Sequence, residues 1–206
     1  YRYYAITYRQ RGSHGPQFLV FHAPASEIKK WADVDRMSPG NPSGAQRPLR
    51  EMKARKVARF FEAENDNTIP TAIVVAVDKS AISFDGRKDP TAGNGHHGVL
   101  AITANTKKPG LIIDGQHRVY GAAETPQDIR LNVVALLGAD DAERAFQFVV
   151  INNSANRVSP DHIKALNLNY KPEVLNKRLL QSARLGIREE TYEGLQVVDT
   201  SKDSPF

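Results

Sequence analysis

The residues best suited to chemistry stand together in the segment 111–118, whose sequence is LIIDGQHR. An apolar run ends at Asp114 and Gly115, and a Gln-His-Arg triplet follows at once. If a helix begins here, its first backbone N–H groups have no partners within the helix and carry positive potential. Gly115 leaves room for an approaching anion, and the planar guanidinium of Arg118 suits a phosphate. The segment therefore predicts a phosphate-binding turn.

The same residues also have a purely structural interpretation. Asp114 could cap the helix, Gly115 could be a turn glycine, and Arg118 could be a solvated surface charge. Short turns that contain glycine commonly join a strand to a helix, so the motif alone does not decide between the two interpretations.

A second group of candidates is a basic run between residues 47 and 59. Six Lys or Arg residues stand in these thirteen positions, opposed only by Glu51. They are Arg47, Arg50, Lys53, Arg55, Lys56 and Arg59. The run is compatible with a solvated helix face and also with a surface that follows a nucleic-acid backbone.

Hydrophobic patterning places these candidates on an α+β framework. Strands are predicted at residues 4–8, 18–20, 69–77, 99–103, 111–113 and 131–137, and a long polar loop is predicted at 85–98. Helices are predicted after Ser26, at 49–61, at 115–124, from the capping residue Asp140 to 151, and from 159 and 171 onward. We therefore expect a core over residues 1–138 and a helical extension over 139–206.

The composition limits the class of protein. The 206 residues include 28 Lys and Arg against 23 Asp and Glu, which gives a net charge of +5, and 40% are hydrophobic. Such a chain can bury a core, and its basic excess suits an anionic partner as well as plain solubility. The absence of cysteine excludes disulfides, thiolate metal sites and a cysteine nucleophile.

Location and metal binding can also be addressed from the sequence. The apolar run 72–77 is far shorter than a membrane-spanning helix, so we expect no membrane partner and a cytoplasmic location. The chain lacks an initiator Met, and we expect it to be part of a longer protein. His96 and His97 are adjacent, and adjacent residues rarely bind one ion together, so no metal site is expected.

The motif at residues 113–118 resembles the signature of the DGQHR-domain proteins, whose DndB branch belongs to DNA phosphorothioation systems. Further elements of that family have matches here in the same order, over residues 44–165. They are the QRPL sequence at 46–49 with the basic helix after it, the Pro-led strand at 69–77, and the Phe-x-x-Ile-Asn element at 148–152. The family often has Gln shortly after that Asn, where this chain has Ala155.

More distantly, residues 115–118 are similar to the Gly-x-x-Arg phosphate motif of the ParB and sulfiredoxin superfamily. This similarity implies a small mixed sheet with packed helices, followed here by the helical extension. It also implies a bound nucleoside triphosphate, ATP or another, with Mg²⁺. Sulfiredoxin chemistry itself is excluded, because this chain has no cysteine.

The resemblance implies roles for the turn. Gly115 and the N–H groups of Gln116 and His117 would hold phosphate oxygens, and Arg118 would neutralise charge. Arg47 and Arg50 are further candidates to reach the nucleotide.

Asp114 and His117 are the catalytic candidates if the nucleotide is hydrolysed. His117 could donate to a phosphate or carry a proton. Asp114 could cap the helix, hold magnesium through water, or orient the attacking water.

The DNA-binding candidates are Lys53, Arg55, Lys56, Asn152 and Arg157. The leading hypothesis is a nucleotide-binding, DNA-associated protein of a bacterial DNA-modification or phage-defence system, with ATP hydrolysis left open. Its expected partners are DNA, the nucleotide and other proteins of that system. One alternative is a repressor of phosphorothioation genes that needs no nucleotide. A nuclease is another, but the sequence has no acidic cluster of recognisable spacing. The oligomeric state is not fixed by the sequence.

Overall fold

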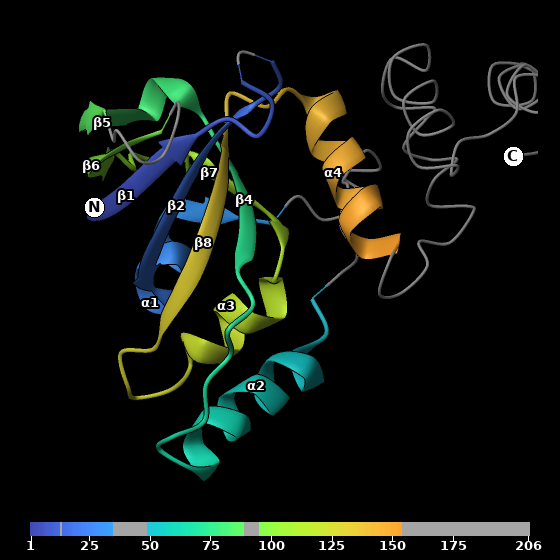
Figure 1. The fold of residues 1–206 in the computed structure, drawn as a ribbon. Helices are drawn as coiled ribbons and strands as arrows, with labels where there is room; N and C mark the ends of the chain where they lie inside the picture. Colours follow the sequence, from blue (N-terminus) through green and yellow to red (C-terminus); the bar gives the residue numbers. More distant parts are fainter. Residues whose placement is uncertain (13, 35–48, 89–94, 154–206) are drawn as a thin grey trace, which may run out of the picture. The chain divides into compact units, whose positions relative to one another are not determined.

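The computed structural model describes residues 1–12, 14–34, 49–88 and 95–153. The chain divides into two compact units, one comprising Tyr1–Arg36 with Gln46–Ala139 and the other comprising Met37–Ala45 with Asp140–Phe206. The first unit contains the sheet and the candidate turn (Figure 1). In the second unit the described element is the helix α4 (Asp141–Asn153). The helices expected from residues 159 and 171 lie outside the described residues.

The first unit is built on one eight-stranded mixed sheet. Its strands are β1 (Arg2–Tyr8), β2 (Gln17–Pro24), β3 (Ala32–Asp33), β4 (Ile73–Val77), β5 (Ile82–Lys88), β6 (His96–Ile102), β7 (Gly110–Asp114) and β8 (Arg130–Leu137). They lie in the order β3-β7-β4-β8-β2-β1-β6-β5. The pairs β3–β7 and β4–β8 are parallel and the others are antiparallel. The predicted mixed α+β class is therefore confirmed.

Three helices of the first unit support the candidate turn. They are α1 (Ala25–Trp31), α2 (Glu51–Ala63) and α3 (Gln116–Ala122), and a 3-10 turn, η1 (Lys79–Ala81), joins β4 to β5. The helix α1 lies behind β2 and β8 in Figure 1 and packs against α3. Helix α2 packs closely on α3, since a Cβ atom at Gly121 would lie 2.3 Å from the carbonyl oxygen of Ala54. None of the described helices is long and apolar enough to cross a membrane.

An aromatic cluster fixes α1 to the hairpin formed by β1 and β2. The ring of Tyr3 stacks on Phe21 at 5.1 Å between centroids, and Trp31 is fully buried beside both rings. The indole N–H of Trp31 donates to the Tyr3 hydroxyl at 2.9 Å, and that hydroxyl donates to Glu27 at 2.8 Å. Burial, together with the hydrogen bond to Glu27, raises the pKa of Tyr3. On the side of the sheet that faces α1, the buried Trp31 N–H and the Tyr3 hydroxyl thus both have hydrogen-bond partners within an apolar core.

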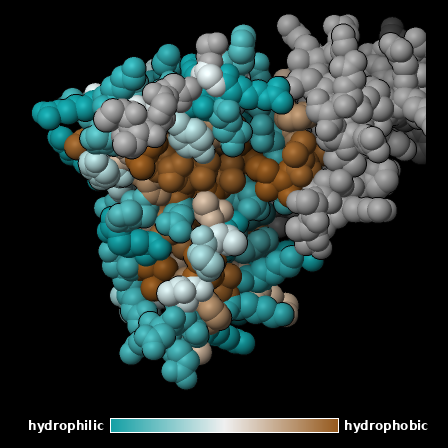
Figure 2. Space-filling view, in the orientation of Figure 1, coloured by the Kyte–Doolittle hydropathy of each residue, from teal (hydrophilic) through white to brown (hydrophobic). Residues whose placement is uncertain are grey.

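The opposite side of the sheet carries an apolar band that crosses the strands and is bordered by hydrophilic residues (Figure 2). Strand β1 alternates between the two sides, with Tyr3, Ala5 and Thr7 buried and Tyr4 and Ile6 exposed. This alternation follows from the two-residue period of a strand.

The prediction of a polar loop at residues 85–98 is wrong at both ends of that range. Residues 85–88 belong to β5 and residues 96–98 belong to β6, and the two strands pair with Gly86 opposite Gly98. The prediction failed because β5 is the edge strand of the sheet and is largely exposed, so it needs no apolar alternation. The strand expected at 69–77 begins only at Ile73, which leaves residues 69–72 as a separate segment.

The helix ends agree with the sequence in one case and differ in another. The Asp140 carboxylate accepts a hydrogen bond from the Glu143 N–H at 2.8 Å, as expected of a cap. Ser26 does not cap α1, because that helix begins at Ala25 with Pro24 at its N-cap.

Candidate phosphate-binding site

The candidate turn joins β7 to α3, and its geometry requires a glycine. Gly115 has φ of 94°, in the left-handed region, and it occupies the N-cap position of α3. A Cβ atom there would lie 2.6 Å from Cγ2 of Ile73. No side chain caps the helix, so the interpretation of Asp114 as the cap is wrong. The pairing of β4 with β7 shifts register between Val74 and Val75, beside Asp114.

Arg118 is held by four protein acceptors. Its Nη1 donates to the Thr71 carbonyl at 2.8 Å, to the Thr71 hydroxyl at 2.7 Å and to the Ala72 carbonyl at 2.9 Å. Its Nη2 donates to Oδ2 of Asp114 at 2.6 Å. The Arg118 side chain is only 18% exposed, so the interpretation as a solvated surface charge is wrong. The guanidinium fastens the segment before β4 to α3 and balances the charge of Asp114.

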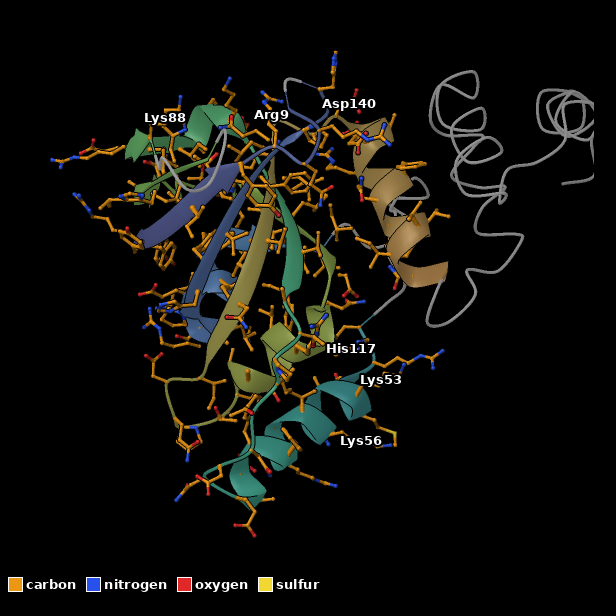
Figure 3. The ribbon with its side chains drawn as sticks, in the orientation of Figure 1. Arg9, Lys53, Lys56, Lys88, His117 and Asp140 are labelled. Carbon is orange, nitrogen blue, oxygen red and sulfur yellow. The ribbon has the colours of Figure 1, made fainter. Side chains whose placement is uncertain are left out.

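His117 connects α3 to the beginning of α2. Its Nε2 accepts a hydrogen bond from the backbone N–H of Arg50, the N-cap of α2, at 3.2 Å. Burial lowers the pKa of His117, and the positive charges of Lys53 and Arg50 lower it further, against the opposing effect of Asp114. Figure 3 shows His117 on α3 facing the end of α2 from which Lys53 extends. The imidazole is therefore kept neutral in surroundings that would favour an anion.

The exposed side of α2 carries the basic run. Ala54, Ala58 and Phe61 are buried toward α3, which turns the other face of the helix to solvent. The cations on that face are Lys53, Arg55, Lys56 and Arg59, all exposed. Among the described residues the carboxylate paired with one of them is that of Glu51, 3.6 Å from Arg55. Lys53 and Lys56 are labelled in Figure 3.

The structure thus brings together two sets of predicted residues. Asp114 contacts Arg118, while His117 meets Arg50 and lies near Lys53. Gly115 and Gln116 stand between Asp114 and His117 as the first residues of the turn and of α3.

The structure does not place the remaining candidates relative to the turn. Asn152 belongs to the second unit, where its amide donates to the Phe148 carbonyl at 2.9 Å within α4. Arg47 and Arg157 lie outside the described residues.

Sequence reasoning missed the acceptors that hold Arg118. Two of them are backbone carbonyls, at Thr71 and Ala72, and a carbonyl leaves no mark in a sequence. The one available signal was the polar Thr71 directly after Pro70, at the beginning of an otherwise apolar run. Within the described ranges, no group of three or more His, Asp or Glu residues lies close enough together to hold a metal ion.

Comparison with known proteins adds a family and one distant fold. The family model of DndB, described as DNA-sulfur modification-associated, matches residues 4–181. No curated protein matches the chain. Among solved structures, the chain is similar to C-terminally truncated ParB of Caulobacter crescentus, a chromosome-partitioning protein complexed to the centromeric parS site. The identity is 14%, the match covers 88% of this chain and 73% of that one, and the TM-score is 0.33.

Proposed function

Because this chain belongs to the DndB family of DNA-sulfur modification-associated proteins, we propose that it binds DNA through the exposed basic face of α2. The observation that carries the proposal is the orientation of α2. Ala54, Ala58 and Phe61 are buried on the side of α3, and Lys53, Lys56 and Arg59 face solvent. Met52 and Phe60 are exposed as well. Lys and Arg side chains that reach phosphates supply most of the sequence-independent affinity for DNA.

The surroundings of His117 support the same surface. Burial lowers the pKa of His117, and the positive charges of Lys53 and Arg50, both from the basic run, lower it further. A phosphate placed among these groups would relieve the repulsion between them. The DNA backbone would then run along α2 with one phosphate beside the turn. Action in the cytoplasm with other proteins of a DNA-modification system is part of this proposal.

The test is duplex binding by a charge-removal variant. A fluorescent duplex is titrated with wild type and with the triple variant Lys53→Ala, Lys56→Ala and Arg59→Ala. The matched control removes three exposed cations away from α2, with Lys30→Ala, Lys79→Ala and Lys107→Ala. We expect the triple variant to bind at least about tenfold more weakly and the control to change little. Equal losses in both would mean that only net charge matters, and the proposal would fail.

A second candidate function is binding of a nucleoside triphosphate at the same place. Since Arg118 is engaged with Thr71, Ala72 and Asp114, we assign the phosphate contacts to Arg50, Lys53 and His117 instead. The turn has no room for a side chain at position 115, because a Cβ atom there would lie 2.6 Å from Cγ2 of Ile73. Magnesium would arrive with the nucleotide, and hydrolysis would fall to Asp114 and His117.

Calorimetric titration of ATP and CTP with Mg²⁺ into wild type and Lys53→Ala tests this second candidate. Micromolar binding that Lys53→Ala loses, and that Lys30→Ala keeps, would support it. Absence of binding by wild type would remove it. Duplex binding that needs no nucleotide would then favour a regulator, such as a repressor of the modification genes.

A further inference from the structure

The sheet has a second surface with the chemistry of a nucleic-acid site, on the side away from α1. Ile6 of β1 pairs with Val20 of β2 and with His97 of β6. Val20 pairs in turn with Val134 of β8. Because cross-strand partners lie on the same face, these residues form one row across four strands.

An exposed tyrosine stands next to this row. Tyr4 is two residues before Ile6 on β1, so both point to the same side of the sheet. Its side chain is 64% exposed, and its ring centroid lies 6.3 Å from that of His97 at an interplanar angle of 31°. An aromatic ring this exposed stabilises the fold little, because most of its apolar area still faces water. Most of Tyr4 is therefore accessible from solvent.

Three arginines surround the tyrosine on the same side. Arg2 lies two residues before Tyr4 on β1 and is exposed. Arg87 of β5 pairs with His97, which places it in the row of Ile6. Arg130 donates from Nε to Nδ1 of His22 at 2.9 Å. We call the surface formed by Arg2, Tyr4, Arg87, His97 and Arg130 the tyrosine face.

Among the residues that the structure describes, two acidic residues lie near this surface, Asp128 and Asp85. Asp128 is 3.6 Å from Arg130 and is therefore partly balanced. Asp85 pairs with Val99, which in turn pairs with Tyr4, so its carboxylate lies at the far end of that row. The three arginines outnumber these two carboxylates.

We propose that the tyrosine face binds single-stranded DNA, with one base stacked on Tyr4 and the flanking phosphates held by Arg2, Arg87 and Arg130. The inference rests on the proposed association with DNA but uses a surface different from α2. An aromatic platform with cations around it is the arrangement that single strands require, because every base has a flat face and every linkage a negative charge. The apolar row of Ile6, Val20 and Val134 provides an apolar contact surface for the neighbouring sugar and base.

The occupant is a single strand rather than a duplex because a paired base does not offer its flat face. A duplex exposes phosphates and groove edges, which suits the long cationic face of α2. The tyrosine face instead offers one ring and a short apolar contact surface. A chain that contacts both forms would hold duplex on α2 and an unpaired stretch on the sheet.

The experiment measures binding of a short fluorescent oligothymidylate and of a duplex to the same set of variants. Tyr4→Ala should weaken binding of the single strand by about 5- to 100-fold, the range for loss of one stacked base, and should leave duplex binding unchanged. Tyr4→Phe should restore it, because the ring is kept. Tyr1→Ala is the control, since Tyr1 is an exposed aromatic residue that directly precedes β1.

The outcomes separate this inference from the proposed function. If Tyr4→Ala binds the single strand as wild type does, the tyrosine face is not the site, and an interface with a protein becomes its explanation. If the α2 triple variant keeps duplex binding while Tyr4→Ala loses the single strand, the proposed function fails and this inference stands. If Tyr4→Phe behaves like Tyr4→Ala, the hydroxyl and not stacking is responsible, which also contradicts the inference.

Discussion

Arg118 and Asp114 form an ion pair across the candidate turn, with Nη2 and Oδ2 2.6 Å apart. The pair links the last residue of β7 to the first turn of α3, and the remaining guanidinium nitrogen reaches the segment before β4. Arg118, the arginine of the motif, therefore stabilises the fold by joining these segments. The cations left to meet a phosphate come from α2, a helix that sequence analysis treated as a separate feature.

Loss of the hydrogen bonds and the ion pair made by Arg118 is expected to destabilise the protein. Arg118→Ala leaves the Asp114 carboxylate and two carbonyls without their donor, so we predict a loss of about 2–3 kcal/mol in the free energy of unfolding. Arg118→Lys should recover only part of it, because an ammonium cannot reproduce the planar set of contacts. Urea unfolding of the three proteins provides the measurement. Wild-type stability for Arg118→Ala would contradict the role given to this residue.

Gly115 offers a test of the turn geometry. Gly115→Ala combines a left-handed backbone with a Cβ atom 2.6 Å from Ile73, and we predict a loss of about 2–4 kcal/mol. The control is Gly12→Ala, where φ is also positive at 55° but nothing lies within 4 Å of the added atom. That variant should lose only about 1 kcal/mol, the cost of the backbone conformation alone. Thermal or urea unfolding would show whether the two differ as expected.

The pH dependence of stability should report on His117. Its pKa is below 6.5 in the folded protein, so the unfolded chain binds more protons between the two values. The stabilising contribution of neutral His117 is complete above about pH 6.5 and is lost as the pH falls through the folded pKa. Protonation of Nε2 would also remove the acceptor for the Arg50 N–H. His117→Gln should show a smaller decrease in unfolding free energy over the same range, and an identical decrease would refute the assignment.

Binding of an anion should move the same pKa in the opposite direction. A phosphate near Arg50 and Lys53 would offset their charges, so the pKa of His117 should rise when duplex DNA is added. The imidazole C–H resonances followed against pH by NMR give this value directly. His14 lies in an exposed turn and serves as the internal control. A pKa that DNA leaves unchanged would place the backbone away from the turn.

Much of the framework could be predicted from the sequence because it rests on local patterns. The β-branched runs of β4 and β8 are buried strands, and Asp140 caps α4 through its own carboxylate. The edge strand β5 could not be predicted, since exposed positions such as Asp85 and Arg87 carry no hydrophobic period. Its existence depends on pairing with β6, and that pairing is decided by tertiary contacts.

The position of the turn between a strand and a helix was predicted, but the distant residues that contact Arg118 were not. The motif correctly placed Asp114, Gly115, His117 and Arg118 between a strand and a helix. Besides Asp114, the partners of Arg118 stand 46 and 47 positions away in the chain, at Ala72 and Thr71. Contacts over such a separation, made to backbone carbonyls, follow from the packed fold and from no pattern in one sequence.

The central claim is that the cations of α2 contact DNA phosphates, and the salt dependence of duplex binding tests it most directly. The measurement is the slope of the logarithm of the binding constant against the logarithm of salt concentration, for wild type and the Lys53, Lys56 and Arg59 triple alanine variant. Each lost phosphate contact should make the slope shallower by about one unit, so we predict a change of about two to three units. The same slope in both proteins would contradict the account.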